Sequence, residues 1–245
     1  MVDAETALNT AETPDIISMT GVSFAWPGER SFRLTIDDFT LKRGTRTLLL
    51  GPSGSGKSTL LSLLCGITQP DRGTITLLGT DLTTLSSAAR DRFRAEHIGI
   101  IFQMFNLLPY GTALDNVLLP LSFAAGRRDR IRKGGSEDEA ATQILGALGI
   151  DGELLSGGTA QLSVGQQQRV AAARALIGAP EIIVADEPTS ALDTEREDAF
   201  LGLLFDQIKA AGSTLIMVSH DESLAPRFDQ ALNLTDLISK EAPAA

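Results

Sequence analysis

The chain has 245 residues and 43% of them are hydrophobic, which is enough apolar material for one large core and excludes a small disulfide-stapled protein. Asp and Glu total 31 against 21 Lys and Arg, and the formal net charge of -10 argues against a surface that binds nucleic acid in bulk. The single cysteine, Cys65, fits a reducing cytoplasmic location. Residues 1–14 carry carboxylates in place of the basic start and apolar stretch of a signal peptide, and no apolar run reaches the roughly 18 residues of a membrane span. We therefore expect a cytoplasmic protein that is soluble by itself.

The first two hydrophobic segments have the character of antiparallel β-strands. Residues Ile16 to Trp26 and Phe32 to Leu41 are rich in β-branched and aromatic side chains. Within the second segment, Phe32, Leu34 and Ile36 alternate with polar neighbours, as expected of a strand with one buried face. The chain is therefore expected to open with an antiparallel β part.

A strand, a glycine loop and a helix are predicted next. The apolar run Thr45 to Leu50 ends at Gly51, a Gly/Ser-rich turn follows, and the leucines of Lys57 to Cys65 suit a buried helix. Later strand candidates are Thr74 to Leu78, Ile98 to Phe102, Glu181 to Ala185 and Thr214 to Val218. Several of these are too uniformly apolar to face water on either side, so we interpret them as central strands of a mainly parallel sheet that is covered on both faces.

Between about residues 104 and 165 the strand signal disappears, and helical patterns replace it at Thr112 to Phe123 and Glu137 to Leu148. We interpret this part as a helical insertion in an α/β core. The stretch Gly126 to Glu139 is basic in its first half and acidic in its second. A solvated loop leading into a helix with a negative first turn is favoured over a nucleic-acid site. The tail from Ser239 is expected to be frayed.

Residues 51–59 carry the phosphate-binding pattern G-x-x-x-x-G-K-[ST] between the expected strand and helix. Glycines let successive backbone N–H groups converge on a polyphosphate, and the helix adds the positive end of its dipole. Lys57 then offers a charge to the β- and γ-phosphates, and Ser58 offers a hydroxyl to Mg²⁺. The alternative, a glycine-rich turn without a ligand, would not need lysine followed by serine at the helix start. The residues expected to bind the nucleotide here are Gly51, Ser53, Gly54, Ser55, Gly56, Lys57, Ser58 and Thr59.

A pair of carboxylates follows the apolar segment Ile182 to Ala185, at the end of an expected strand, where an open α/β sheet places its ligands. Asp186 suits coordination of Mg²⁺, directly or through water. Glu187 can orient and deprotonate an attacking water, which is the role of a general base. The alternative is a pair of solvated carboxylates, but a random surface pair would not follow four residues of buried type.

The residues Leu162 to Gln166 read LSVGQ and run directly into 167–176, which begins Gln-Gln-Arg. This stretch resembles the LSGGQ signature of ATP-binding-cassette (ABC) transporters, with Val164 where the usual pattern has glycine. A serine hydroxyl and a glycine N–H at a helix start form an anion site. An earlier copy, Leu155 to Gly158, lacks the glutamine and the Gln-Gln-Arg segment, so we interpret it as an approach loop. The resemblance to the nucleotide-binding subunit of such transporters covers roughly residues 15–235.

The resemblance also implies roles for residues elsewhere in the chain. Gln103 resembles the Q-loop glutamine, which contacts the metal or the attacking water and lies beside the groove where transporter subunits dock. Ser190 to Asp193 resembles the D-loop, which joins the two active sites of a dimer. His220 resembles the H-loop histidine, which contacts the γ-phosphate and positions the water and Glu187. Trp26 stands where the family usually has an aromatic residue that stacks on adenine. The alternatives are a structural histidine and an ordinary aromatic at a strand end.

The fold implied by the resemblance is the ABC ATPase fold. It is an α/β P-loop NTPase core with a mainly parallel sheet, an N-terminal antiparallel β part and a helical insertion. The expected domain spans residues 15–238, with a helical subdomain at about 104–178 and flexible ends at 1–14 and 239–245.

The implied activity is ATP hydrolysis by a homodimer. Two copies would pack head to tail, so that the signature residues of one copy cap the γ-phosphate held by the lysine loop of the other. The nucleotide-binding residues of the signature would be Ser163, Gly165 and Gln166, with Ser163 and Gly165 capping the γ-phosphate. The catalytic residues would be Glu187, His220, Gln103 and Lys57, and the Mg²⁺ ligands Ser58, Gln103 and Asp186. Closure of the dimer on ATP would power a separate integral membrane permease, which places the chain at the cytoplasmic face of the membrane.

Among ABC subunits, the stretch Phe102 to Pro109, with Asp115 to Val117 and Pro120 after it, looks closest to the lipoprotein-releasing and macrolide-export type. Three alternatives stand beside a transport subunit. A non-transport ABC ATPase of DNA repair or translation would carry a long coiled coil or a second cassette, which this sequence lacks. A small P-loop kinase would not need the signature together with the Q-loop glutamine and the H-loop histidine. A nucleotide-gated scaffold would not need the intact catalytic residues.

Overall fold

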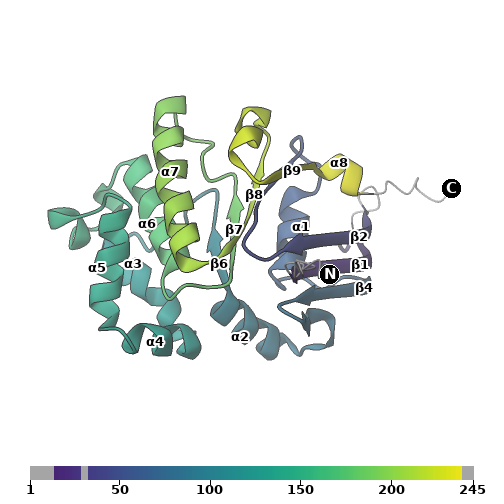
Figure 1. Cartoon of the computed structure of the whole chain (residues 1–245), viewed down its shortest axis with the longest axis horizontal. Coiled ribbons are helices and arrows are strands. Elements are labelled where there is room, and N and C mark those ends of the chain that lie inside the picture. The colour runs from purple at the N-terminus through teal and green to yellow at the C-terminus, as the bar shows by residue number, and fades with distance from the viewer. Residues whose placement is uncertain (1–13, 29–32, 239–245) are drawn as a thin grey trace, which may run out of the picture.

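The computed structural model describes residues 14–28 and 33–238. Residues 1–13 and 239–245, which belong to the ends expected to be flexible, lie outside the described residues, as does Phe32. Figure 1 shows three parts in a row: an antiparallel sheet at one end, a parallel sheet in the middle and a group of helices at the other end. This arrangement confirms the expected fold, a mainly parallel sheet with an antiparallel part before it and helices inserted within it.

The antiparallel sheet contains β1 (Asp15–Phe24), β2 (Leu34–Lys42), β4 (Arg72–Leu77) and β5 (Thr80–Asp81), in the order β2-β1-β4-β5. The pairing of β1 with β2 sets Val22 opposite Ile36 and Phe24 opposite Leu34. All four of these side chains are buried, so the alternation in the sequence corresponds to one buried face of this sheet. The prediction of an antiparallel opening is confirmed.

The strand predicted at Thr74 to Leu78 forms as β4, but its interpretation as a central strand of the covered sheet is wrong. β4 pairs antiparallel with β1 and with β5. Its burial is one-sided, because Ile75 and Leu77 are buried whereas Thr74 is exposed. This alternation is typical of an antiparallel sheet with one solvated face, and a strand covered on both faces would not show it.

The helices pack around and beyond the parallel sheet. They are α1 (Lys57–Leu64), α2 (Ser87–His97), α3 (Ala113–Leu118), α4 (Ala125–Arg132), α5 (Glu137–Ala147), α6 (Val164–Leu176), α7 (Thr194–Ala211) and the short α8 (Leu234–Leu237). Short 3-10 segments lie at Leu82–Thr84, Leu119–Ser122, Gly152–Leu155, Thr159–Gln161 and Glu222–Arg227. Among residues 14–28 and 33–238, no helix is both long and apolar enough to cross a membrane.

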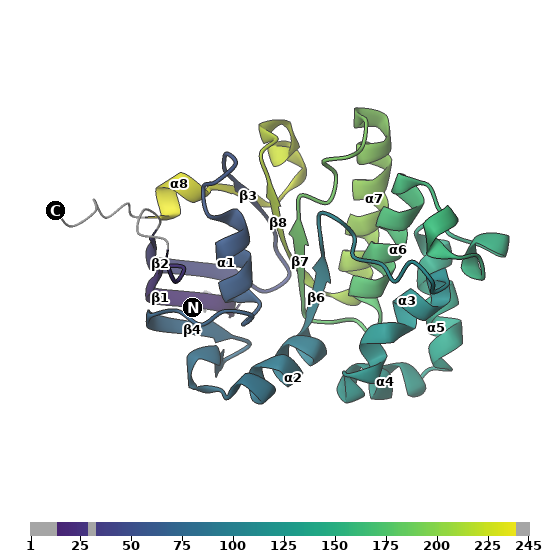
Figure 2. The same ribbon diagram turned by 180° about the vertical axis from the view of Figure 1, so that it is seen from behind.

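The parallel sheet contains β3 (Arg46–Leu50), β6 (Ile98–Ile101), β7 (Ile182–Asp186), β8 (Thr214–Ser219) and β9 (Gln230–Asn233), in the order β6-β7-β8-β3-β9. Side chains of β7 alternate between two cores. Ile183 and Ala185 belong to the core formed with α6 and α7, whereas Ile182 and Val184 belong to the core formed with α1 and the antiparallel sheet. Figure 2 shows α6 and α7 on one side of β7 and α1 with the antiparallel sheet on the other. This sheet is therefore covered on both faces, as its continuous apolar strands predict.

Of the helices, α2, α4, α7 and the short α8 are not among the predicted elements. α2 has no buried residue and is polar overall, so no run of apolar residues marks it as a helix. α7 does carry an apolar stripe at helical spacing, which is formed by Phe200, Leu201, Leu204, Phe205 and Ile208. The signal for α7 is thus present in the sequence, whereas the one for α2 is weak.

The interpretation of Gly126 to Glu139 as a loop before a helix is wrong in its first half. Residues 125–132 form α4, and the side chain of Arg127 is only 2% exposed. The second half is confirmed, because α5 begins after Ser136 with three carboxylates in its first turn. The Ser136 side chain accepts a hydrogen bond from the N–H of Glu139 and thereby caps this helix.

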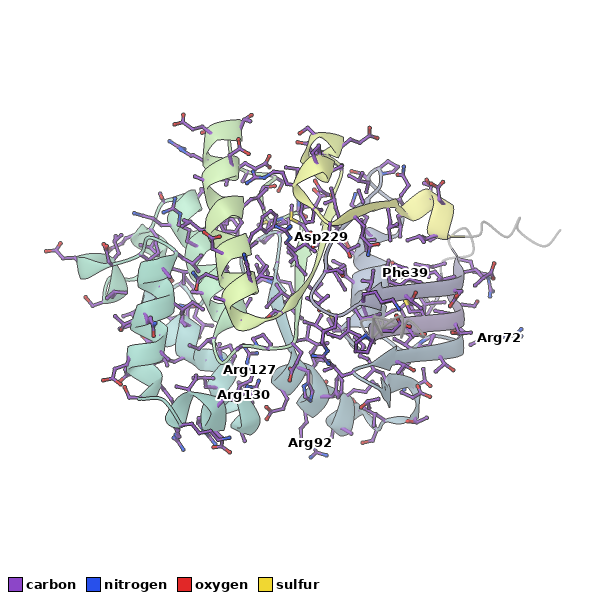
Figure 3. All side chains as sticks on the ribbon, in the orientation of Figure 1. Phe39, Arg72, Arg92, Arg127, Arg130 and Asp229 are labelled. Atoms are coloured by element: carbon purple, nitrogen blue, oxygen red, sulfur yellow. The ribbon has the colours of Figure 1, made fainter. Side chains whose placement is uncertain are left out.

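Arg127 explains why a basic segment becomes a buried helix. Its guanidinium donates to the main-chain oxygens of Ile177 (2.8 Å), Ala175 (3.0 Å) and Ala95 (3.3 Å). Burial lowers the pKa of Arg127 to about 10, which shows that the protein holds this charge against a desolvation penalty. Arg130 of the same helix donates to Gly178, and Figure 3 shows both arginines where the helical part meets the parallel sheet. The two arginines thus attach α4 to the end of α6.

Replacing Arg127 by methionine is expected to lower the free energy of unfolding by about 2–3 kcal/mol, because several buried carbonyl oxygens lose their donor while the apolar stem is kept. Arg132→Met in the same helix is the control, since Arg132 is exposed and pairs with Glu137 at the surface. The free energy of unfolding of the Arg132→Met variant should fall by less than about 1 kcal/mol. Urea-induced unfolding measures the free energy of unfolding of both variants. An equal decrease in the two would show that the buried hydrogen bonds of Arg127 stabilise the fold no more than the surface contact of Arg132.

The parallel direction of the sheet decides where the chemistry can occur. β3, β6, β7 and β8 all run the same way, so the loops after their carboxyl ends meet at one edge of the sheet. These loops contain the glycine pattern, Gln103, the carboxylates 186–187 and His220. The candidate site is built from them.

Candidate functional site

The loop between β3 and α1 is shaped by its glycines. Gly54 and Gly56 have φ angles of +78° and +98°, which residues with a side chain rarely adopt. At Gly51 a Cβ atom would lie 2.6 Å from the Oγ of Ser55, so the loop is also too tight for a larger residue there. Within the described residues, no side chain caps the start of α1 at Gly56. The first N–H groups of this helix are therefore available to an anion.

Lys57 lies at the centre of this loop and is only 7% exposed. Its Nζ donates to the main-chain oxygens of Gly51 at 2.6 Å and Pro52 at 3.2 Å. The same Nζ lies 3.1 Å from Oε1 of Glu187, a side chain that is also largely buried. In this arrangement the carboxylate neutralises the lysine. A polyphosphate entering the loop would compete with Glu187 for the ammonium group.

Glu187 occupies a strained position directly after β7. Its φ angle is +42°, in the left-handed region, which costs about 1–3 kcal/mol for a residue with a side chain. Its N–H donates to the oxygen of Val218 at 3.1 Å, which ties it to β8. Its Oε2 lies 3.2 Å from Nδ1 of His220, the residue after β8. The carboxylate thus stands between Lys57 and His220.

Asp186 ends β7 and lies beside the start of α1. Burial raises the pKa of Asp186 above its usual value, and the neighbouring charge of Glu187 raises it further. The charge of Lys57 and a hydrogen bond with Ser58 act in the opposite direction. A cation placed between Asp186 and Ser58 would relieve the electrostatic penalty at this carboxyl group.

The structure brings most of the predicted nucleotide residues into one cavity of about 640 Å³. Its lining consists of Trp26, Ser53, Gly54, Gly56, Lys57, Ser58, Thr59, Gln103 and Glu187. The indole of Trp26 is 38% exposed, and its Nε1 donates to Oγ1 of Thr59 at 3.1 Å. The ring packs edge-on against Phe24, with 5.0 Å between the centroids. The lining therefore includes both a flat aromatic ring and a cation.

The signature residues lie elsewhere in the chain. Ser163 is the N-cap of α6, its Oγ accepts from the N–H of Gln166 at 3.3 Å, and Oε1 of Gln166 accepts from the N–H of Ser163 at 2.9 Å. Ser163, Gly165 and Gln166 line a second groove of about 480 Å³ together with Ala191 and Leu192. This groove is separate from the lysine cavity, so one chain does not bring the signature residues and the glycine loop together.

The sequence does not single out Arg174, which supports the segment after Gln103. Arg174 is buried, and its guanidinium donates to the main-chain oxygens of Asn106 at 2.6 Å and Phe105 at 2.5 Å. Phe105 and Asn106 both have positive φ angles, +59° and +50°, so this turn depends on its support. The only signal for Arg174 is an arginine inside the alanine-rich run Ala171 to Ala175.

Comparison with known proteins agrees with this geometry. The family model described as ABC transporter matches residues 34–190. The lipoprotein-releasing system ATP-binding protein LolD of Anaeromyxobacter dehalogenans is 43% identical over 199 residues, which cover 81% of each chain. The macrolide export ATP-binding/permease protein MacB of Rhodopirellula baltica is 41% identical over 196 residues, which cover 80% of this chain and 28% of that protein.

Among solved structures, this chain is similar to the ATP-binding cassette MJ0796 in a dimeric, post-hydrolysis state bound to ADP and Pi. The TM-score is 0.75 at 31% identity, and the match covers 93% of this chain and 98% of that one. The matched residues 34–190 contain the glycine loop, the signature segment and the carboxylates. The chain belongs to the ABC transporter family and is an ATP-hydrolysing, ATP-binding subunit of that family.

Proposed function

We propose that this chain binds ATP with Mg²⁺ in the cavity between Trp26 and Glu187, forms a homodimer when it does so, and powers a separate membrane permease of the lipoprotein-releasing or macrolide-export type. The observation that carries the proposal is the contact of 3.1 Å between Lys57 and Glu187 at the uncapped start of α1. It places a phosphate-binding cation and a candidate base in one cavity. The direct experiment measures ATP binding and ATP turnover in the Glu187→Gln variant. The variant should still bind ATP but should no longer hydrolyse it.

The glycine loop supplies the nucleotide contacts. The N–H groups at the start of α1 and the ammonium of Lys57 bind the phosphates, with Ser53 and Thr59 beside them in the lining of the cavity. Oγ of Ser55 is buried and has no hydrogen-bond partner among the described residues, so it is a polar atom that a ligand can satisfy. Once the phosphates bind the ammonium of Lys57, the carboxylate of Glu187 is released from its ion pair with Lys57 and can accept a proton from water. His220, at 3.2 Å from that carboxylate, holds its orientation.

The residues at the cavity fit Mg²⁺ as the cofactor. Ser58, Asp186 and Gln103 offer a hydroxyl, a carboxylate and an amide oxygen, which are the hard ligands that this ion prefers. The described part of the chain has no cluster of three or more His, Cys, Asp or Glu that could hold a metal by itself. Such a sparse donor set suits an ion that arrives with phosphate and water ligands. When bound, Mg²⁺ neutralises charge on the phosphates.

The separation of the two anion sites supports a dimer. Ser163, Gly165 and Gln166 line a groove of their own, so they can reach a nucleotide only on a second copy. A head-to-tail pair with two-fold symmetry would place each signature segment over the partner's lysine loop. The similar cassette MJ0796 is described as dimeric in a state bound to ADP and Pi, which supports the same assembly here. We also propose a domain of residues 15–238 with a helical subdomain at about 104–178.

The membrane partner is inferred from the relatives and from an apolar groove. LolD and MacB carry lipoprotein release and macrolide export in their names, and MacB also carries a permease. A groove of about 460 Å³ between α2, β6 and the helical part is lined by Phe102, Pro120 and Phe123, among others, and the side chain of Phe123 is exposed. Met104 and Tyr110 are exposed near it in sequence. A permease segment seated there would hold the chain at the cytoplasmic face of the membrane.

The proposed adenine contact predicts a fluorescence change. Trp26 is the single tryptophan of the chain, so its emission reports on this cavity alone. Adding ATP or ADP with Mg²⁺ should change that emission. Calorimetry of Trp26→Ala should show about 5- to 150-fold weaker binding of ATP, because a stacked base contributes about 1–3 kcal/mol. Inorganic tripolyphosphate, which has no base, is the control, and its binding should be equal in the two proteins. An unchanged ATP affinity in Trp26→Ala would remove the adenine contact from the proposal.

A further inference from the structure

A single side chain joins the signature helix to the loop that carries Glu187. Gln168 lies in the second turn of α6, is only 1% exposed, and donates through Nε2 to the main-chain oxygen of Pro188 at 2.5 Å. Pro188 directly follows Glu187 in the chain. A carbonyl oxygen can only accept, so the amide nitrogen must face it and the orientation of the Gln168 amide is fixed. The helix that starts at the signature segment is therefore bonded to the residue next to the proposed base.

The backbone at Glu187 depends on such support. Its positive φ angle persists only where neighbouring contacts hold it in place. Its N–H donates to Val218 and its oxygen accepts from the N–H of Ser190 at 3.3 Å. The bond from Gln168 to Pro188 holds the next peptide unit. If one of these supports moves, the carboxylate of Glu187 moves with it.

The other end of the Gln168 amide is unsatisfied. Its Oε1 is buried and has no hydrogen-bond partner among the described residues. Gln168 also lines the groove between the signature segment and residues 191–192. A buried oxygen without a partner is costly, so any movement of these segments that brings a donor within reach is favoured. The Gln168 amide is thus bonded on its donor side and open on its acceptor side, so its hydrogen bonding can respond to a movement of the signature segment.

We propose that Gln168 is a positioning residue that links the signature segment to Glu187 of the same chain. Through this link, which we call the relay, a contact of the signature segment with the partner's nucleotide changes the placement of Glu187. The relay rests on the proposed function. In the head-to-tail dimer, Ser163 of one copy contacts the nucleotide of its partner, while Glu187 of that same copy acts on its own nucleotide. Gln168 thus makes the placement of the base at one site depend on the nucleotide at the other, and couples the two sites through α6.

A double-mutant cycle on ATP hydrolysis tests the relay. Gln168→Met keeps the length and burial of the side chain and removes the bond to Pro188, so kcat should fall about tenfold while KM for ATP stays unchanged. Ser163→Ala removes a donor at the γ-phosphate and should lower kcat about a hundredfold. If Gln168 relays the signature state, the double variant has the kcat of Ser163→Ala alone. A further tenfold fall in the double variant, or a normal kcat in Gln168→Met, overturns the relay.

The chain offers a matched control at the opposite end of β7. Ser213 is buried, and its Oγ donates to the main-chain oxygen of Pro180 at 2.6 Å, two residues before β7, as Pro188 lies two residues after it. Ser213→Ala should lower the melting temperature as Gln168→Met does, but leave kcat within about twofold. Equal losses of kcat in the two variants would mean that the bond of Gln168 is only structural.

Failure of the relay and failure of the proposed function give different results. The second readout is the ATP-dependent dimer of the Glu187→Gln variant. If that dimer forms and the kcat effects of Gln168→Met and Ser163→Ala multiply, only the relay is wrong. If no dimer forms with ATP bound, the proposed function is wrong and the relay falls with it.

Discussion

ATP hydrolysis should fall about a thousandfold when Glu187 is replaced by glutamine, while ATP binding persists. The carboxylate has one oxygen at 3.1 Å from Nζ of Lys57 and the other at 3.2 Å from Nδ1 of His220. An amide of the same size can occupy this place, but it cannot accept a proton from water. It also no longer neutralises Lys57, so the lysine is more available to the phosphates, and the affinity for ATP should be equal or higher. Steady-state turnover and calorimetric titration measure the two effects separately.

The control for this variant is Glu222→Gln, which makes the same change at an exposed carboxylate after β8. Its turnover should match that of the unmodified protein. If Glu187→Gln hydrolysed ATP at the normal rate, the base would have to be another group, and the arrangement of Lys57, Glu187 and His220 would need a different explanation.

The second large effect is expected at Lys57. Lys57→Met keeps the apolar stem and removes the ammonium group, and ATP binding should weaken at least about a hundredfold. The ammonium is a buried charge whose present partners are the oxygens of Gly51 and Pro52 and the carboxylate of Glu187. Its replacement therefore removes a charge-assisted contact to the phosphates and also a support of the loop itself. Calorimetric titration with ATP and Mg²⁺ gives the loss of affinity.

Lys209→Met is the matched control, because Lys209 is an exposed lysine in the last turn of α7. Its affinity for ATP should be unchanged. Lys57→Arg is not a conservative change at this site, since a planar guanidinium does not fit the space of a compact ammonium held by two carbonyl oxygens. Nearly normal binding in Lys57→Met would mean that the backbone N–H groups alone hold the phosphates.

The site could be predicted from the sequence where function is encoded locally. The glycine loop needs positive φ angles at Gly54 and Gly56, and only the residue type itself reveals them. Asp186 ends, and Glu187 follows, a strand whose apolar run indicates burial on both faces. Because parallel strands bring their carboxyl ends to one edge, the residue pattern alone is enough to place these separate motifs together.

The sequence was less informative where a polar side chain binds main-chain atoms far along the chain. Arg127, Arg174 and Gln168 are all buried, and each donates to carbonyl oxygens at least 20 residues away. Main-chain oxygens exist at every residue, so no residue type marks the acceptor. A basic segment such as 126–133 is therefore predicted to be solvated, although part of it is buried. The helix α2 escapes prediction for another reason, because it is polar overall and has no buried residue.

The molar mass of the Glu187→Gln variant in solution, measured by light scattering with and without ATP and Mg²⁺, bears most directly on the central claim that two copies of the chain share their ATP sites. We expect the 26.0 kDa of one chain without nucleotide and twice that mass with ATP, and we expect Ser163→Ala in the same background to reduce the dimer. A mass that stays at one chain while calorimetry shows ATP bound would contradict this account.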